Sequence, residues 1–246
     1  MSFIGDGMAG VVQAVADVTA LIGRPPVVVG GLAVMCRLSS PYRATTDLDL
    51  VDRLRGPAPH LQVLRAGEGA EAEQPAAVLL PTRFGPVKVD VLEVRQVEID
   101  EPSDDPGDRL HASSHAWADD TATPVTIEVQ HSRGGEPVRV TTPVAEPGPL
   151  VAMKLQAVMN RAAAKQGTDL QDVVRLALDP AVRDRLLDQI EGCDRQMAAD
   201  IATHVDLWLV RRRDASLRWI HATAGGDLTR DDLDLAAELL LDATAR

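Results

Sequence analysis

The chain has 246 residues, of which 45% are hydrophobic, enough for one large or two modest domains with their own cores. Its formal net charge of −12 is unlike the overall positive charge that is usual in nucleic-acid-binding proteins. No run approaches the roughly 18 apolar residues of a membrane span, and the first residues lack the pattern of a secretory signal. We therefore expect a cytoplasmic protein with no membrane partner.

The first fifty residues predict two helices and two strands in alternation. Apolar residues recur at helical spacing over residues 6–22, and Gly23 followed by two prolines ends that segment. A β-branched run at residues 27–29 predicts a strand, which a glycine pair terminates. A short helix over residues 32–38 follows, and alternating residues then predict a second strand at 46–51.

This second strand carries Asp47 and Asp49, which share one face because side chains alternate along a strand. Two neighbouring carboxylates repel each other, and a divalent cation offsets that repulsion; Mg²⁺ is commonly held by one or two carboxylates plus substrate phosphates. Gly30 and Gly31, placed between a strand and a helix, let a phosphate approach backbone amides closely. The stretch therefore predicts a phosphate and Mg²⁺ site, and the alternative is that the two aspartates are only solvated.

The middle of the chain predicts more strands, at residues 76–80, 87–94, 124–130 and 137–142, the last two forming a hairpin. The strand at 87–94 places Lys88 and Asp90 on one face. Residues 98–120 are acidic and rich in Ser and Pro, so we expect an irregular connection there. The histidines of this region, His111, His115 and His131, lack metal-ligand spacing, and we interpret them as surface residues.

Three prolines within residues 143–149 predict a boundary between domains at 1–145 and 146–246. Beyond it, helical periodicity predicts a bundle with helices at 150–164, 169–178, 180–190, 196–221 and 231–245. The stripe Lys154, Ala157, Arg161 and Lys165 would lie on one face of the first of these helices.

Two features of this half have alternative interpretations. Asp169 is either a site residue or the cap of the helix that begins there. The basic run 211–213, with Trp208 and Trp219 nearby, is either an RNA-contacting face or, as we favour, a solvated helix surface.

The motifs together resemble the AbiEii-type toxins of the DNA polymerase β-like nucleotidyltransferase superfamily. An apolar strand with a glycine pair precedes Thr45-Thr46-Asp47-Leu48-Asp49, with Arg43 just upstream. In the second half, Lys154, Ala157 and Arg161 match a K-x-x-A-x-x-x-R pattern, and Asp169 and Asp172 match a D-x-x-D pattern. The resemblance implies an α+β fold, with an N-terminal mixed nucleotidyltransferase sheet flanked by helices and a C-terminal helical bundle. Thr168 stands where an Arg is common, which leaves one substrate contact of the family in question.

The resemblance also implies roles for particular residues. Asp47, Asp49 and a third carboxylate on a neighbouring strand would hold two Mg²⁺ ions. Asp90 is the preferred third carboxylate, and Glu93 is the reserve. Lys154 and Asp169 would be catalytic, and the nucleotide would lie in a cleft between the two halves. The nucleotide-binding residues would be Gly30, Gly31, Arg43, Thr46, Lys154 and Arg161.

The implied reaction transfers a nucleoside monophosphate from a nucleoside triphosphate to an acceptor hydroxyl and releases pyrophosphate. The acceptor implied by the family is a tRNA 3′ end, and a cognate antitoxin protein would be a partner. Two alternatives stay open: transfer to a small molecule such as an aminoglycoside, and a non-catalytic relative that binds a nucleotide or a protein.

Overall fold

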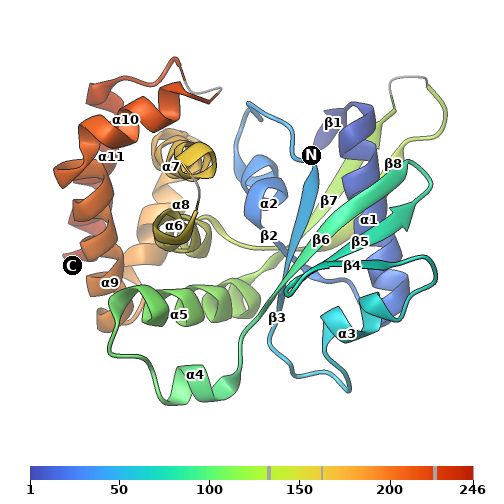
Figure 1. The fold of residues 1–246 in the computed structure, drawn as a ribbon. Helices are drawn as coiled ribbons and strands as arrows, with labels where there is room; N and C mark the ends of the chain where they lie inside the picture. Colours follow the sequence, from blue (N-terminus) through green and yellow to red (C-terminus); the bar gives the residue numbers. More distant parts are fainter. Residues whose placement is uncertain (132–133, 162, 224–225, 246) are drawn as a thin grey trace. The chain divides into compact units, whose positions relative to one another are not determined.

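The structure is a computed structural model that describes residues 1–131, 134–161, 163–223 and 226–245. It is an α+β protein, with one mixed eight-stranded sheet and eleven α-helices in those residues (Figure 1). The chain forms two compact units. The sheet unit contains residues 1–36, 41–96 and 118–145, and the helical unit contains 37–40, 97–117 and 146–246. None of the described helices is long and apolar enough to cross a membrane.

The sheet has the strand order β1-β7-β8-β2-β3-β6-β5-β4. β3 runs parallel to β6, β2 is parallel to β8, and β1 is parallel to β7, whereas the other neighbours are antiparallel. The expected mixed sheet is therefore confirmed, and β1 and β4 are additions to the predicted strands. The strands are β1 (Ser2–Ile4), β2 (Val27–Val29), β3 (Asp47–Asp52), β4 (Glu71–Gln74), β5 (Ala77–Thr82), β6 (Gly85–Glu93), β7 (Thr123–Gln130) and β8 (Val138–Val144).

Three helices accompany the sheet: α1 (Asp6–Ile22), α2 (Gly30–Arg37) and α3 (His60–Arg65). The long α1 contacts β3 and β5 to β8 and covers one face of the sheet (Figure 1). A Cβ atom at Gly10 of α1 would lie 3.4 Å from Val87, so the valines of β6 face α1. Because side chains alternate along a strand, Lys88 and Asp90 lie on the opposite face of the sheet.

The helical unit is built from most of the remaining helices. The expected irregular connection at 98–120 is wrong, because α4 and α5 occupy it. Arg109 of α5 donates two hydrogen bonds of 2.7 Å to the carboxylate of Asp200, and Leu110 is fully buried. The helices are α4 (Gln96–Asp100), α5 (Pro106–Thr121), α6 (Pro147–Ala157), α7 (Ala163–Leu178), α8 (Arg183–Glu191), α9 (Arg195–Val205), α10 (Arg213–His221) and α11 (Arg230–Thr244).

Two predicted helices are interrupted. The helix expected at 150–164 ends in a 3-10 turn at Val158–Asn160, and Arg161 has extended backbone angles (φ −100°, ψ 150°). The helix expected at 196–221 contains a π-helical segment, Asp206–Arg211, between α9 and α10. In both places the apolar periodicity continues through the irregularity, so the sequence pattern alone does not reveal it.

Candidate functional site

The first glycine of the pair lies beneath the side chain of Asp49. Val29, the last residue of β2, is the partner of Asp49 in β3, and the chain turns immediately afterwards at Gly30 with φ +64°. A Cβ atom at Gly30 would lie 1.9 Å from Oδ2 of Asp49 and 2.5 Å from its Cγ. Only glycine therefore fits under this carboxylate, which gives a physical reason for the first glycine of the motif.

The second glycine lies beneath a guanidinium group. A Cβ atom at Gly31 would lie 3.1 Å and 3.2 Å from the two terminal nitrogens of Arg43, and 3.0 Å from Oγ1 of Thr45. Gly30 and Gly31 are also the first residues of α2, where backbone amides have no partner within the helix. Helix amides beside a guanidinium are groups that bind phosphate.

The two threonines before β3 have different surroundings. Thr45 is buried, and its hydroxyl donates a hydrogen bond of 2.8 Å to Oδ1 of Asp47. This bond orients the Asp47 carboxylate. Thr46 is exposed at the start of the strand, and its role in nucleotide binding stays a prediction. Thr45 thus holds Asp47 in place, and it is the neighbour of Thr46, the residue expected from the sequence to bind the nucleotide.

Asp90 lies beside Asp49 in the sheet. β3 and β6 are parallel and pair Asp49 with Asp90 and Asp47 with Lys88. Glu93, the reserve candidate, is three residues further along β6 and is exposed, so it points to the other face from Asp90. Its partner Asp52 is buried and accepts hydrogen bonds from the amides of Leu54 and His60. Of the two candidates, Asp90 is therefore the one placed next to the aspartate motif.

Lys88 is a member of this site that the sequence analysis did not select. Its Nζ lies 3.0 Å from Oδ2 of Asp90, and the two side chains are 23% and 18% exposed. The sequence does contain a signal for Lys88, because residues 88 and 90 share one face of the strand. This shared face places an ammonium beside the third carboxylate.

Asp47 and Asp49 are candidate ligands of a Mg²⁺ ion, and Asp90 beside them stays a predicted third ligand. No group of three His, Cys, Asp or Glu side chains in the described part of the chain is arranged to hold a metal ion. Mg²⁺, however, is usually bound by one or two carboxylates together with waters and substrate phosphates. Asp47 and Asp49, on one face and beside the glycine pair, satisfy that requirement.

A second charged cluster lies within the helical unit. The Lys154 ammonium of α6 lies 2.6 Å from Oδ1 of Asp169 and 2.9 Å from Oδ2 of Asp172, both on α7. The three side chains are only 9%, 5% and 0% exposed. Nε of Arg161 lies 3.4 Å from the other oxygen of Asp169, and its side chain is 39% exposed. Arg161 is thus the member of this cluster that reaches the surface.

The helix break changes two expectations about this cluster. Asp169 lies in the second turn of α7 and not at its start, so it is not a helix cap. The single stripe through Lys154, Arg161 and Lys165 is wrong, because α6 ends before Arg161 and Lys165 belongs to α7. Gly167 allows the close approach of α10: a Cβ there would lie 2.1 Å from the carbonyl oxygen of Trp219.

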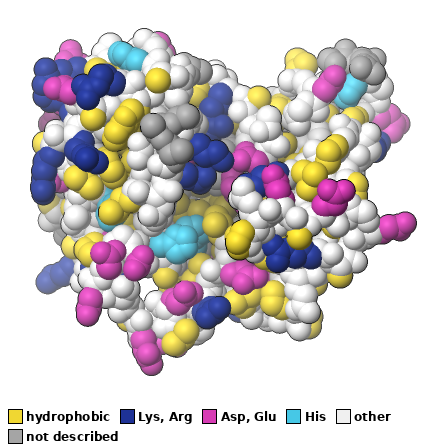
Figure 2. Space-filling view, viewed as in Figure 1, with side chains coloured by type: hydrophobic (Ala, Val, Ile, Leu, Met, Phe, Trp, Pro, Cys, Tyr) yellow, Lys and Arg dark blue, Asp and Glu magenta, His cyan; other side chains and the backbone are white. Residues whose placement is uncertain are grey.

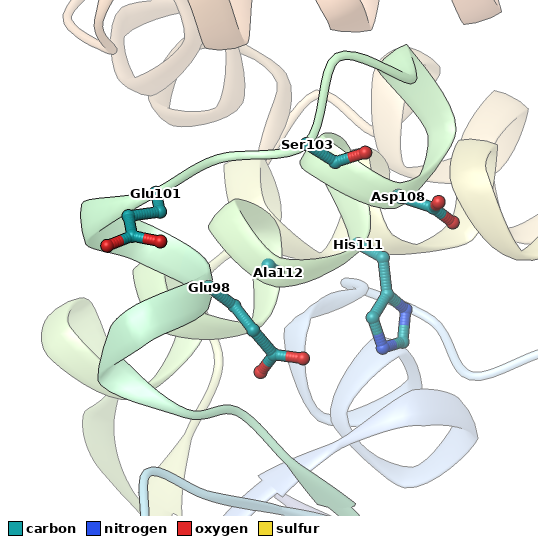
Figure 3. A pocket seen from close by; sticks show the side chains of 6 residues that line it. All are labelled: Glu98, Glu101, Ser103, Asp108, His111 and Ala112. Atoms are coloured by element: carbon teal, nitrogen blue, oxygen red, sulfur yellow. The ribbon is translucent and has the colours of Figure 1, made fainter.

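The helical unit also contains an acidic cavity of about 320 Å³. Figure 3 shows its side chains coming from α4, from the loop after it and from α5: Glu98, Glu101, Ser103, Asp108, His111 and Ala112. His115, one turn further along α5, is buried and packs against His111, with ring centroids 4.3 Å apart and ring planes tilted by 48°. Our interpretation of His115 as a surface residue is therefore wrong.

The basic run at 211–213 does not form a separate cationic surface. Arg211 and Arg213 form ion pairs with Asp206 and Asp234, and Arg212 lies over the ring of Trp208, which is itself buried. On the face seen in Figure 2, basic side chains lie in small groups separated by acidic, apolar and uncoloured surface.

The comparisons with known proteins leave the family undecided. No protein-family model matches this chain, and no curated protein matches it significantly.

Proposed function

We propose that this chain is a Mg²⁺-dependent nucleotidyltransferase that transfers a nucleoside monophosphate from a nucleoside triphosphate to an acceptor hydroxyl. The observation that carries the proposal is the placement of Asp49 over Gly30, with Asp90 beside it on the parallel strand β6. Carboxylates, helix amides and a guanidinium thus occur together on one side of β3, as a Mg²⁺-triphosphate requires.

Each residue of the sheet unit has a distinct role in this proposal. Asp47 and Asp49 would hold a Mg²⁺ ion, which supplies charge neutralisation at the transferred phosphorus. Thr45 fixes the Asp47 carboxylate through its hydroxyl. Arg43, which lies over Gly31, and the first amides of α2 would bind triphosphate oxygens. The acceptor hydroxyl would lose its proton to solvent and attack the α-phosphorus in line, the bond from that phosphorus to the bridging oxygen would break, and pyrophosphate would leave. Catalysis then comes from positioning and charge neutralisation.

The helical unit has a charged cluster of its own, with a cationic group at its surface. Lys154 is buried between Asp169 and Asp172, so in this arrangement it holds the two carboxylates together. Asp169 in turn lies next to the more exposed Arg161. Within this cluster, Arg161 is the group that we propose binds a phosphate group, with Lys154 and Asp169 as its support.

The test is transfer of label from each of the four α-³²P-labelled nucleoside triphosphates, with Mg²⁺, to total RNA. We expect labelled RNA of tRNA length with the wild-type chain and at least about a 100-fold loss with Asp49→Ala. Asp184→Ala is a matched control, because that side chain is 83% exposed and lies on α8. Equal transfer by wild type and Asp49→Ala would refute the catalytic role of this carboxylate.

A small cationic acceptor is the second candidate. The cavity of the helical unit is lined by Glu98, Glu101 and Asp108, and the whole chain carries a net charge of −12. Carboxylates attract an amine-bearing acceptor such as an aminoglycoside and repel the phosphates of RNA. Adding an aminoglycoside mixture to the same assay separates the candidates, because label would then appear in a small molecule and not in RNA. A toxin role with a cognate antitoxin stays part of the RNA proposal only.

A further inference from the structure

Two histidines stand one helical turn apart on α5, where the sequence had predicted an irregular connection. His111 and His115 are four residues apart, and side chains at this spacing lie on one face of a helix. From the sequence we expected no metal-ligand spacing among these histidines. On a helix, however, two histidines four residues apart are the pair that binds Zn²⁺ in the H-E-x-x-H motif. The helical structure of α5 therefore changes the interpretation of this pair.

The hydrogen bonds of both rings are made through Nδ1. Nδ1 of His115 lies 2.6 Å from the backbone carbonyl oxygen of His111. A carbonyl oxygen only accepts hydrogen bonds, so this Nδ1 carries the proton and Nε2 of the neutral ring has a lone pair. Nδ1 of His111 lies 3.4 Å from Oε1 of Gln156 on α6, which favours the same tautomer. Histidines that bind a metal ion through one nitrogen usually donate the other N–H in this way.

The separation of the two rings fits one ion bound by both. Zn²⁺–nitrogen bonds are about 2.0–2.1 Å long, so an ion bound to both Nε2 atoms at about 90–110° holds the ring centroids roughly 4.5–5 Å apart. The centroids of His111 and His115 are 4.3 Å apart, with ring planes tilted by 48°. Small rotations of the side chains therefore suffice to bring both Nε2 atoms to one ion. Imidazole is a preferred ligand of Zn²⁺, Cu²⁺ and Ni²⁺, whereas Mg²⁺ prefers oxygen.

The cavity beside this pair has space for the rest of the coordination shell. His111 lines the cavity of about 320 Å³, and Figure 3 shows its imidazole next to Asp108, one turn earlier on α5. A water molecule occupies about 30 Å³ in the liquid, so the cavity has room for an ion and several waters. In the described residues no third His, Cys, Asp or Glu completes a metal site with the pair, so waters would supply the remaining ligands.

We propose that His111 and His115 bind one transition-metal ion of the Zn²⁺ type through their Nε2 atoms, with waters from the adjacent cavity completing its coordination. Two protein ligands leave positions where a further ligand can replace water, as in catalytic and not structural zinc sites. The site lies within the helical unit and uses none of the residues assigned to nucleotidyl transfer, so it does not rest on the proposed function.

The experiment is a Zn²⁺ titration of the full chain, made without a histidine tag, against a chelator whose absorbance reports free Zn²⁺. We expect the wild type to bind one Zn²⁺ that His111→Asn binds at least about tenfold more weakly, because even loss of an outer-shell partner weakens metal binding about 10–100-fold. His115→Asn should show the same loss. His221→Asn is the matched control: it removes a histidine at the end of α10 and should bind Zn²⁺ as the wild type does.

Cu²⁺ identifies the ligands directly. The electron paramagnetic resonance spectrum of the wild type with one Cu²⁺ should show coupling to two imidazole nitrogens, and that of His111→Asn should not. Circular dichroism checks the fold of each variant, and the half-exposed His111 decides the test if the buried His115→Asn unfolds. Equal Zn²⁺ affinity of the wild type and folded His111→Asn would overturn the inference, as would a wild-type Cu²⁺ spectrum without coupling to imidazole nitrogen.

Discussion

Replacing Gly30 with alanine tests whether the side chain of Asp49 lies over Gly30. The substitution adds one methyl group, which is unfavourable for two separate reasons. The backbone of Gly30 has φ +64°, a conformation that disfavours any Cβ, and the new Cβ would lie 1.9 Å from Oδ2 of Asp49. The side chain of Asp49 must therefore move away from its place beside Asp90, or the turn after β2 must shift.

The size of the effect follows from these two obstacles. A left-handed backbone costs a residue with a Cβ about 1–2 kcal/mol, and forcing Asp49 off its rotamer adds about 0.5–1.5 kcal/mol. Gly30→Ala should then lower the free energy of unfolding by about 1.5–3.5 kcal/mol. Gly23 is a matched control, because it has φ +77° at the end of α1 but no atom within 4 Å of its added Cβ. Gly23→Ala should show the backbone cost alone.

Urea denaturation of both variants gives the two free energies, and Mn²⁺ binding reports on the carboxylate. We expect Gly30→Ala to lose more stability than Gly23→Ala and to bind Mn²⁺ at least about tenfold more weakly, the effect expected for a displaced ligand shell. If Gly30→Ala is no less stable than Gly23→Ala and binds Mn²⁺ normally, Asp49 does not lie over the glycine.

Two further predictions concern the helical unit. Lys154→Met leaves Asp169 and Asp172 buried without their ammonium, so the free energy of unfolding in urea should fall by about 3–5 kcal/mol. The same substitution at the exposed Lys165 should change it by less than about 0.5 kcal/mol, and similar losses at both positions would contradict the burial of the cluster. Burial and the nearby His111 lower the pKa of His115 from 6.5 to about 3, so only the unfolded chain gains its proton between these values. The free energy of unfolding is therefore unaffected by His115 above pH 6.5 and falls as the pH drops from 6.5 toward 3. His115→Gln should reduce the difference between the unfolding free energies measured at pH 7.5 and at pH 5. If His115→Gln leaves this pH dependence of the unfolding free energy unchanged, His115 is not a buried, neutral side chain.

The sequence indicates most strands because alternation and β-branched residues are local signals. β3 and β6 have these signals, and both were expected. β4 has none, because all four of its residues are exposed at the edge of the sheet, and β1 is only three residues long. The polar composition of α5 predicts a connection and not a helix. Its burial comes from a few positions such as Leu110, and from partners far along the chain such as Asp200, which pairs with Arg109.

Only some residues of the candidate site could be predicted from the sequence. Asp47, Asp49 and Asp90 stand in local patterns, so their residue types and spacing suggested a site. The placement of Lys88 and Asp90 beside Asp47 and Asp49 depends on the register of β3 against β6. The contact of Thr45 depends on the path of the loop before β3. Register is a long-range property, and no short motif encodes it. For the same reason the spacing of Lys154 and Arg161 suggested one helix face, although the chain leaves the helix between them.

The helical unit is assembled from three separate stretches of the chain, which the ribosome makes at different times. Arg109 of α5 finds its carboxylate partner at Asp200, 91 residues later, and two strands of the sheet unit, β7 and β8, are made in between. α5 must therefore remain without its partners while the ribosome adds those strands. A gene fragment cut at residue 145 would separate α5 from α9 permanently, so each fragment would expose surface that the intact chain buries.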